Sequence, residues 1–253
     1  MIIHSNPLFT IYFGSAQDRL NQDEYYSISP EIDLLAEPKF KHLADILGIE
    51  SLIFLKQVHE NAGYVVTPET RAQLAQPFAV EGDYLLTDLT GVGIGIMTAD
   101  CLPIIIHDTR TNAIAAIHAG WRGSVQHIAM KAFARMQQAY GTRGVDVRVY
   151  FGPSAKACCY EVGQEVIACA DADPLLADSL VEHNGKSYLH VARYNTLQLL
   201  EVGVPKLAFH LDYNTCTICD ERLCSYRRDG KSPYRQMTVV ALRPSIRAAH
   251  YSG

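Results

Sequence analysis

The sequence predicts a mixed α and β fold of the α+β class. Short apolar runs that suit buried strands alternate with longer segments whose apolar residues recur at helical spacing. This alternation continues along the whole chain of 253 residues, and no linker or internal repeat interrupts it. We therefore expect a single domain over residues 1–253, which is long enough to bury a substantial core.

The first third of the chain predicts one clear helix between strands. Apolar residues at helical spacing indicate a helix over Pro38–Leu47, which ends at Gly48. Strands are expected at 11–13, 51–59 and 64–66. The second of these ends in several polar residues, so His59 is placed at a strand end.

The centre of the chain is residues 83–123, with strands expected at 83–87, 92–98, 102–107 and 113–118. Two polar segments interrupt its apolar runs, Thr98-Ala-Asp-Cys101 and His118-Ala-Gly-Trp-Arg-Gly123. They place a thiol and an imidazole at strand ends. The alternating glycines 91, 93 and 95 do not open a helix, as a dinucleotide fingerprint would, and predict instead a strand packed closely against another backbone.

The last part of the chain alternates helices with strands. The clearest helix is 124–140, whose apolar residues follow the 3.6-residue period up to Gly141. Further helices are expected at 162–172 and 193–202, and strands at 145–151, 186–191, 206–210 and 237–242.

Composition excludes several classes of protein. A formal net charge of −5 and a pI near 6.0 argue against nucleic acid as a partner and favour a small molecule. No apolar run reaches the length of a membrane span, and the first residues lack the features of a signal peptide. Seven cysteines, two of them adjacent, suit reduced thiols better than a disulfide framework. We expect a cytoplasmic protein that does not associate with membranes.

A metal site is one interpretation of His59, Cys101 and His118. Their spacing matches no local zinc motif, so they can share a metal only if the fold brings the strand ends together. Two imidazoles and one thiolate would leave a fourth tetrahedral position open, as in catalytic zinc sites. From spacing alone, an ordinary core cysteine and two strand-end histidines remain the simpler explanation.

Other polar residues are candidates for supporting roles. Asp100 can orient an imidazole or accept a proton, or it can be a turn residue. Arg227 and Arg228 can hold phosphate or carboxylate with forked hydrogen bonds, or form a solvated basic turn. The Cys216-Thr-Ile-Cys219 motif lacks a second pair nearby, so we interpret it as structural.

Several motifs together resemble one family, the laccase-domain family. It is also called polyphenol oxidase, peptidoglycan-editing factor or purine nucleoside phosphorylase of the multifunctional zinc type. The resemblance runs from about residue 56 to 242. The motifs that carry it are Lys56-Gln-Val-His59, Gly82-Asp83, Thr98-Ala-Asp-Cys-Leu-Pro103, Ala116-Ile-His-Ala-Gly-Trp-Arg-Gly123, Gly152-Pro-Ser154, Tyr160-Glu-Val-Gly163 and Ser225-Tyr-Arg-Arg-Asp-Gly230.

This resemblance implies a zinc ion held by His59, Cys101 and His118, with Arg227 and Arg228 as candidates to hold phosphate near the sugar. It implies a layered α/β/β/α fold with mixed sheets. It also implies phosphorolysis of purine nucleosides (adenosine, inosine or methylthioadenosine) and adenosine deamination.

Two departures from the family pattern bear on substrate choice. The family usually has Thr-Arg before a Gly-Gly-Val-Ser segment near the start, whereas this chain has Phe13-Gly-Ser-Ala16 and offers Arg19 instead. The Gly-Arg that is common after the double arginine is replaced by Ser232-Pro-Tyr-Arg235.

Two other enzyme classes stay open. In a thiol hydrolase or amidase acting on a peptidoglycan precursor, Cys101 would be the nucleophile and His118 the base. A copper-dependent polyphenol oxidase is disfavoured, because the chain has no His-x-His pair and only Met97 near Cys101 as an axial ligand. The non-enzymatic alternative is a binding module in which zinc stabilises the fold and no reaction is catalysed.

Overall fold

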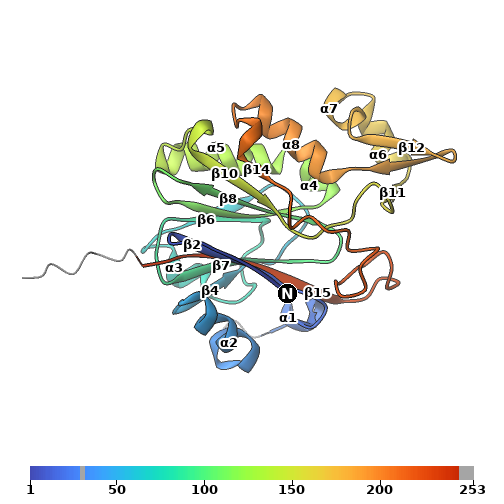
Figure 1. Cartoon of the computed structure of the whole chain (residues 1–253). Coiled ribbons are helices and arrows are strands. Elements are labelled where there is room, and N and C mark those ends of the chain that lie inside the picture. The colour runs from blue at the N-terminus through green and yellow to red at the C-terminus, as the bar shows by residue number, and fades with distance from the viewer. Residues whose placement is uncertain (29–31, 245–253) are drawn as a thin grey trace, which may run out of the picture.

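The computed structural model describes residues 1–28 and 32–244. Two six-stranded mixed sheets stack on each other through these residues (Figure 1). The first sheet has the order β1-β2-β15-β7-β4, with β3 also paired to β15. Its strands are β1 (Ile2–Ser5), β2 (Phe9–Phe13), β3 (Leu20–Asn21), β4 (Ser51–Phe54), β7 (Val92–Thr98) and β15 (Tyr234–Leu242).

The second sheet has the order β14-β10-β8-β9-β6-β5. Its strands are β5 (Gly63–Val66), β6 (Tyr84–Thr87), β8 (Leu102–Asp108), β9 (Ile114–Ala119), β10 (Val147–Phe151) and β14 (Phe209–His210). The chain crosses from the first sheet to the second between β7 and β8. The residues of that short crossover therefore lie at the strand ends, where the two sheets are joined.

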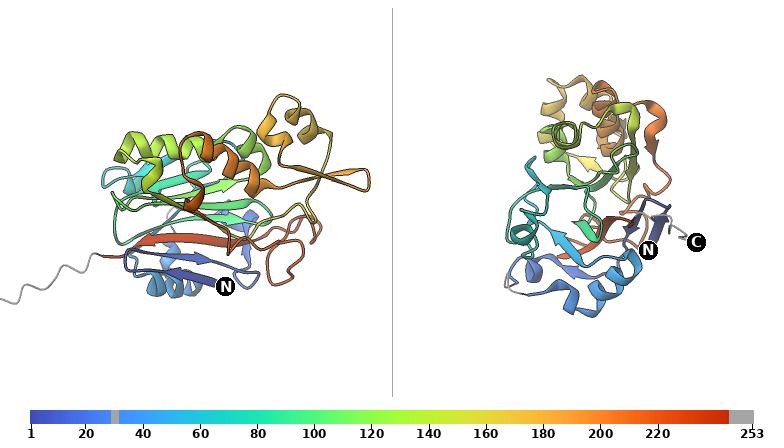
Figure 2. Two further views of the ribbon diagram at one scale, coloured as in Figure 1. Left: turned by 45° about the horizontal axis from the view of Figure 1, so that its top comes forward. Right: turned by 90° about the vertical axis from the view of Figure 1, so that its left-hand side faces the viewer.

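Helices cover the outer face of each sheet, and this confirms the layered α/β/β/α prediction (Figures 1 and 2). Helices α4 (Trp121–Val125), α5 (Ile128–Tyr140) and α8 (Val191–Glu201) lie on the second sheet, and α2 (Pro38–Leu47) lies on the first. The shorter helices are α1 (Gln22–Tyr25), α3 (Arg71–Leu74), α6 (Gln164–Ala170) and α7 (Pro174–Ala177). A small sheet of β11 (Glu161–Val162), β13 (Lys186–Leu189) and β12 (Leu180–His183) lies beside the second sheet.

Three hydrophobic clusters fill the three spaces between the layers. Ile104 and Ile106 of β8 pack toward α5 and α8, whereas Ile105, between them in sequence, packs between the two sheets. This is the two-residue alternation of a strand that is buried on both faces.

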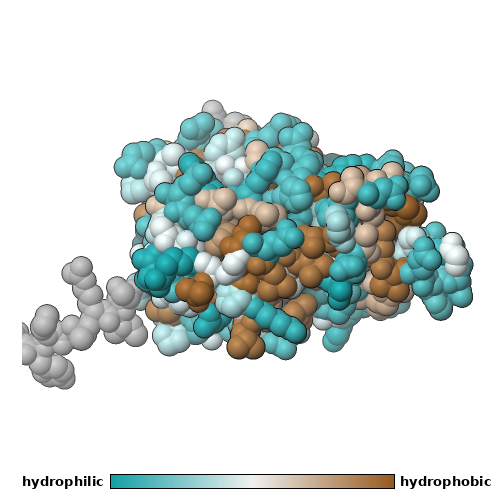
Figure 3. All heavy atoms as spheres, turned by 90° about the horizontal axis from the view of Figure 1, so that it is seen from above, coloured by the Kyte–Doolittle hydropathy of each residue, from teal (hydrophilic) through white to brown (hydrophobic). Residues whose placement is uncertain are grey.

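The third cluster joins α2 to the first sheet through Phe40 and Phe54. On the outer face of the helix layer, hydrophobic residues show among hydrophilic ones (Figure 3).

The helix predicted over 124–140 is wrong in its first turns. The structure has the two helices α4 and α5, separated at His127, whose φ of 61° is left-handed. The side chain of Gln198 on α8 explains the break, because its Nε2 donates to the Ser124 carbonyl at 2.9 Å and lies 3.1 Å from His127 Nδ1. A contact from a distant helix decides this boundary.

The close packing predicted for the glycine strand is made by side chains and not by another backbone. A Cβ on Gly95 would lie 2.5 Å from the ring of Phe54, and one on Gly93 would lie 2.5 Å from Ile49. Phe54 is on the neighbouring parallel strand β4, so its ring lies across β7 where the glycine leaves room. Gly91 serves a different purpose, because its φ is +73° at a turn.

Smaller differences concern element ends. The strand expected at 51–59 ends at Phe54, so His59 lies in the loop that follows. The segment 206–210 begins as a 3-10 helix (Lys206–Ala208). Helix α8 begins at Val191, where the side chain of His190 accepts the backbone N–H of Arg193. The helix over Pro38–Leu47 is confirmed, with Gly48 at its left-handed end.

No helix among the described residues is long and apolar enough to cross a membrane. Residues 29–31 and 245–253 of the expected single domain lie outside the described residues, and its extent over 1–253 stays a prediction.

Candidate functional site

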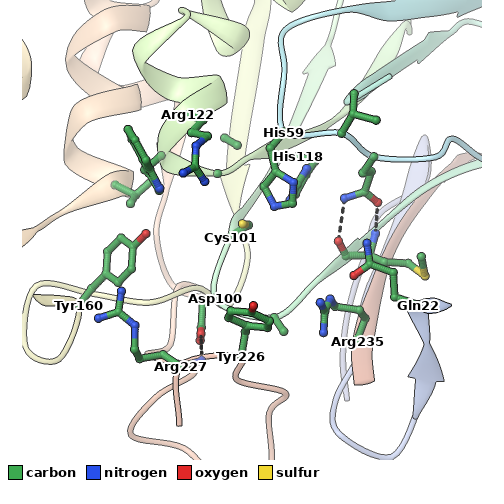
Figure 4. A pocket seen from close by; sticks show the side chains of 18 residues that line it. Gln22, His59, Asp100, Cys101, His118, Arg122, Tyr160, Tyr226, Arg227 and Arg235 are labelled. Carbon is green, nitrogen blue, oxygen red and sulfur yellow. Dashed lines mark hydrogen bonds between the residues drawn. The ribbon is translucent and has the colours of Figure 1, made fainter. Parts of the chain in front are cut away.

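The fold brings His59, Cys101 and His118 together at the ends of strands β7, β8 and β9 (Figure 4). One ligand atom from each lies within 4.8 Å of the others. His59 comes from the loop between β4 and β5, Cys101 from the crossover between β7 and β8, and His118 from the end of β9. Gly120 leaves room for the group, since a Cβ there would lie 3.1 Å from the Cys101 sulfur. The fold therefore brings the three residues close enough to share one metal ion, although they are far apart in sequence.

Asp83 fixes the orientation of His118. Its Oδ1 lies 2.7 Å from Nδ1 of His118, and both side chains are buried. With Nδ1 committed to this hydrogen bond, Nε2 is the ring nitrogen left to act as a ligand. Such carboxylate–histidine pairs are typical behind the ligands of metal sites.

The same carboxylate holds the loop that carries His59. Asp83 accepts the backbone N–H groups of Val58, His59 and Glu60, the last at 2.9 Å. This fixes a loop in which His59 has the left-handed φ of 63°, an uncommon conformation for a residue other than glycine. Asp83 thus positions two of the three candidate ligands. Gly82-Asp83 is one of the motifs of the family resemblance, but the sequence alone assigned Asp83 no role.

The three groups change one another's protonation. Burial alone would raise the pKa of the Cys101 thiol, but interactions with His118 and His59 outweigh it and lower that pKa to about 6. Burial alone would lower the pKa of His118, but the Cys101 sulfur and Asp83 raise it to about 9. Without a metal, the arrangement favours a Cys101 thiolate beside a protonated His118 imidazole. Because a metal ion is bound by thiolate and neutral imidazole, binding would displace the proton from Nε2 of His118.

The donor set fits a catalytic type of metal site. Two imidazole nitrogens and one thiolate sulfur are ligands that suit zinc and copper, and three protein ligands leave a position for substrate or water. Exposure increases from buried His118 through Cys101 to exposed His59. The open position would consequently face the cavity beside the three residues.

That cavity has a volume of about 610 Å³ and is lined by polar and aromatic side chains from both sheets (Figure 4). Its lining residues are Gln22, Gln57, Val58, His59, Met97, Ala99, Asp100, Cys101, His118, Ala119, Gly120, Trp121, Arg122, Tyr160, Val191, Tyr226, Arg227 and Arg235. Gln57 is held by two hydrogen bonds to the backbone of Met97, at 2.7 and 2.8 Å. The volume is in the usual range of small-molecule sites.

Asp100 lies in the cavity wall but orients no imidazole, the role that Asp83 fills. Its Oδ1 accepts the Thr217 hydroxyl at 2.6 Å, and its Oδ2 accepts the backbone N–H of Arg227 at 2.7 Å. Its φ of 83° is a strained value for a residue with a side chain. Asp100 joins the crossover that carries Cys101 to the segment that carries Arg227.

The two neighbouring arginines point in different directions. Arg227 lines the cavity, with its guanidinium 5.2 Å from the ring centre of Tyr160 and one hydrogen bond to the Glu161 carbonyl. Arg228 is not among the cavity-lining residues, and its role as a phosphate ligand stays a prediction. Its guanidinium donates to the carbonyls of Thr217, Asp220 and Leu223 and pairs with Asp229. These bonds hold the segment before β15 in shape.

Two further arginines line the cavity, although sequence reasoning gave neither a site role. Arg122 lies 4.5 Å from the ring centre of Trp121, and Arg235 lies 5.5 Å from that of Tyr226. Arg122 is part of the His118–Gly123 motif, so a signal for it was present. Arg19 is not among the cavity-lining residues, because its guanidinium packs on Tyr234, and Gln22 lines the cavity from that segment.

Known proteins resemble this chain in sequence and structure. The family model described as multi-copper polyphenol oxidoreductase laccase matches residues 36–243. A purine nucleoside phosphorylase of Clostridium acetobutylicum is 30% identical over 92% of this chain and 91% of its own. A protein named adenosine deaminase RL5, from an unknown prokaryotic organism, is 33% identical over 78% of each chain.

A solved structure shares the fold. The crystal structure of the hypothetical protein YfiH from Bacillus licheniformis superimposes with a TM-score of 0.77, covers 93% of each chain and has 26% sequence identity. The family match includes the whole second sheet, strands β4, β7 and β15 of the first sheet, and His59, Cys101 and His118. The chain therefore belongs to the family of the multi-copper polyphenol oxidoreductase laccase domain.

Proposed function

We propose that this protein is a zinc-dependent purine nucleoside phosphorylase. The observation that carries the proposal is the convergence of His59, Cys101 and His118 on a cavity that also holds arginine and aromatic side chains. Similarity to a chain named purine nucleoside phosphorylase supports the substrate class. Adenosine, inosine and methylthioadenosine are the candidate nucleosides, with phosphate as the second substrate.

The cavity offers separate groups for the two substrates. Arg227, Arg122 and Arg235 supply positive charge for phosphate, and the guanidinium fork suits its oxygens. Tyr160, Tyr226 and Trp121 supply aromatic surface for a purine. Burial raises the pKa of Tyr160, so its hydroxyl stays protonated and can donate a hydrogen bond.

The remaining site residues act by position and charge. A zinc ion bound by His59, Cys101 and His118 would act as a Lewis acid on a ligand oxygen or nitrogen, or lower the pKa of a bound water. Asp83 holds His118 and the His59 loop, and Asp100 holds the backbone at Arg227. Asp100 thus serves phosphorolysis by fixing Arg227, and its two occupied oxygens make it a poor base toward substrate.

The test is base release that depends on phosphate. Zinc-loaded protein incubated with each nucleoside and phosphate should form free base and a sugar phosphate, and His118→Ala should abolish this. His183→Ala is the matched control, because His183 is an exposed histidine of the β12–β13 hairpin. Zinc-loaded protein that releases no base at saturating phosphate would refute the proposal.

Adenosine deamination is the second candidate activity. The position left open by three protein ligands can take water, and the similarity to a protein named adenosine deaminase favours it. Conversion of adenosine to inosine without phosphate would establish it. Two other outcomes separate the remaining classes: activity that survives zinc removal but not Cys101→Ser indicates a thiol hydrolase, and oxidation of a phenol by copper-loaded protein indicates an oxidase.

A further inference from the structure

A second group of metal-ligating side chains lies outside the candidate site. The sulfur atoms of Cys158, Cys159, Cys216 and Cys219 all lie within 4.8 Å of one another. Two come from the turn after β10 and two from the turn after β14, about 60 residues further along the chain. The second pair that Cys216-Thr-Ile-Cys219 lacks in sequence is thus supplied in space by two adjacent cysteines.

The sulfur distances suit a shared ion. Four sulfurs around one zinc ion, each about 2.3 Å from it, are about 3.8 Å apart from one another. The Cys158 and Cys219 sulfurs are 3.7 Å apart, which matches this value, whereas those of Cys159 and Cys219 are 3.0 Å apart and would separate when the ion binds. These separations are well above the length of a disulfide bond, about 2.05 Å, and all four cysteines are free thiols.

The surroundings hold the four thiols in place. The two turns are joined by backbone hydrogen bonds between Ser154 and residues 215 and 217, at 3.0 and 3.1 Å. Lys156 Nζ also donates to the Asn214 carbonyl at 3.0 Å. A partly buried set of four thiols in a fixed frame is typical of a structural site for a soft divalent cation.

We propose that Cys158, Cys159, Cys216 and Cys219 bind a zinc ion in a closed, structural site. No position remains for substrate, since all four ligands come from the protein. The ion would link the segment after β10 to the segment after β14. Each of these segments continues into residues that line the cavity or contact its lining. Tyr160 follows Cys159, and Thr217, which follows Cys216, donates to Asp100. The second zinc would therefore stabilise the positions of Tyr160, Asp100 and Arg227.

Metal content separates this site from the His59–Cys101–His118 site. Protein purified under reducing conditions with zinc should contain about two zinc ions per chain. Cys216→Ser combined with Cys219→Ser should leave about one, and so should Cys101→Ser combined with His118→Ala. Cys169→Ser, at a free cysteine outside the cluster, should retain both.

X-ray absorption at the zinc edge identifies the ligands. In the Cys101→Ser and His118→Ala protein, the remaining zinc should show sulfur neighbours alone, at about 2.3 Å. If the double serine variant does not fold, wild-type protein gives the answer instead. Its average should be about two and a half sulfurs per zinc with both sites filled, against about one sulfur with the His–Cys site alone.

Two results would overturn the proposal. One is wild-type protein that holds a single zinc and loses it entirely in the Cys101→Ser and His118→Ala variant. The other is a disulfide between Cys159 and Cys219 in protein kept under reductant, detected by a chain mass about 2 Da lower. Neither result depends on catalysis, so the phosphorylase proposal is tested separately.

Discussion

The carboxylate of Asp83 accepts a hydrogen bond from Nδ1 of buried His118 at 2.7 Å and also accepts backbone N–H groups of the loop that carries His59. One carboxylate therefore orients a ligand from β9 and a ligand from the β4–β5 loop. Burial favours its neutral form, but the contact with His118 outweighs this and lowers the pKa of Asp83, so it stays charged. The metal affinity of the site should depend on this second layer of contacts.

Asp83→Asn should weaken zinc binding by about 10- to 100-fold. An asparagine can satisfy His118 with its oxygen, but its NH₂ group then faces the N–H group of Glu60, and two donors cannot pair. Competition with a chelator measures the affinity. Asp88→Asn, at the exposed far end of β6, is the control and should bind zinc like wild type. Equal affinities in the two variants would contradict the role of Asp83.

Arg227→Ala and Arg228→Ala should separate binding from stability. Without Arg227, the KM for phosphate should rise about tenfold or more while the free energy of unfolding changes little, because its guanidinium lines the cavity. Without Arg228, three backbone carbonyls lose a charged donor, and unfolding should become easier by about 2 kcal/mol. Urea unfolding and phosphate titrations check both. The reverse pattern would mean that Arg228 is the phosphate ligand.

The sequence pattern predicted individual strands and helices better than the contacts that join them, and the layered arrangement was implied only by the family resemblance. The buried strands and the helix over Pro38–Leu47 follow from local patterns. The spacing of apolar residues and the glycine that ends the helix both lie within one short segment of sequence. The break at His127 is not local, because Gln198 on another helix causes it. The need for glycine at position 95 is not local either, because it comes from the ring of Phe54 on the neighbouring strand β4.

The candidate site shows the same division. Cys101 and His118 stand out in the sequence as polar residues at the ends of apolar strands. They could therefore be predicted as site residues, but their arrangement in space could not. That Asp83 supports His118, that Arg228 turns away and that Arg235 lines the cavity are facts of side-chain direction. The four-cysteine cluster was hidden because its halves are about 60 residues apart in sequence. Long-range contacts leave no periodic trace in a single sequence.

Cys101 should react at unusually low pH once the metal is removed. Because its pKa is lowered to about 6, the folded protein carries the thiolate above that pH, whereas an ordinary thiol does so only above about 8.5. Alkylation of Cys101 in chelator-treated protein, followed by peptide mass spectrometry, should reach its plateau rate near pH 7. Added zinc should protect Cys101 at every pH in this range. A rate that still rises steeply at pH 8 would contradict the lowered pKa.

Gly95→Ala should destabilise the fold by about 1–3 kcal/mol, because a methyl group there would lie 2.5 Å from the Phe54 ring in a close-packed layer. Phe54→Leu removes that ring edge and costs stability by itself, but it should make the alanine much less harmful. The double-mutant cycle from urea unfolding should therefore give a favourable coupling of about 1 kcal/mol between the two substitutions. Gly185→Ala at the β12–β13 turn is the control: its Cβ would meet open space, and its cost would come from its φ of +70° and be independent of Phe54. If the costs of Gly95→Ala and Phe54→Leu simply add, the ring does not explain the glycine, and the strand needs it for another reason.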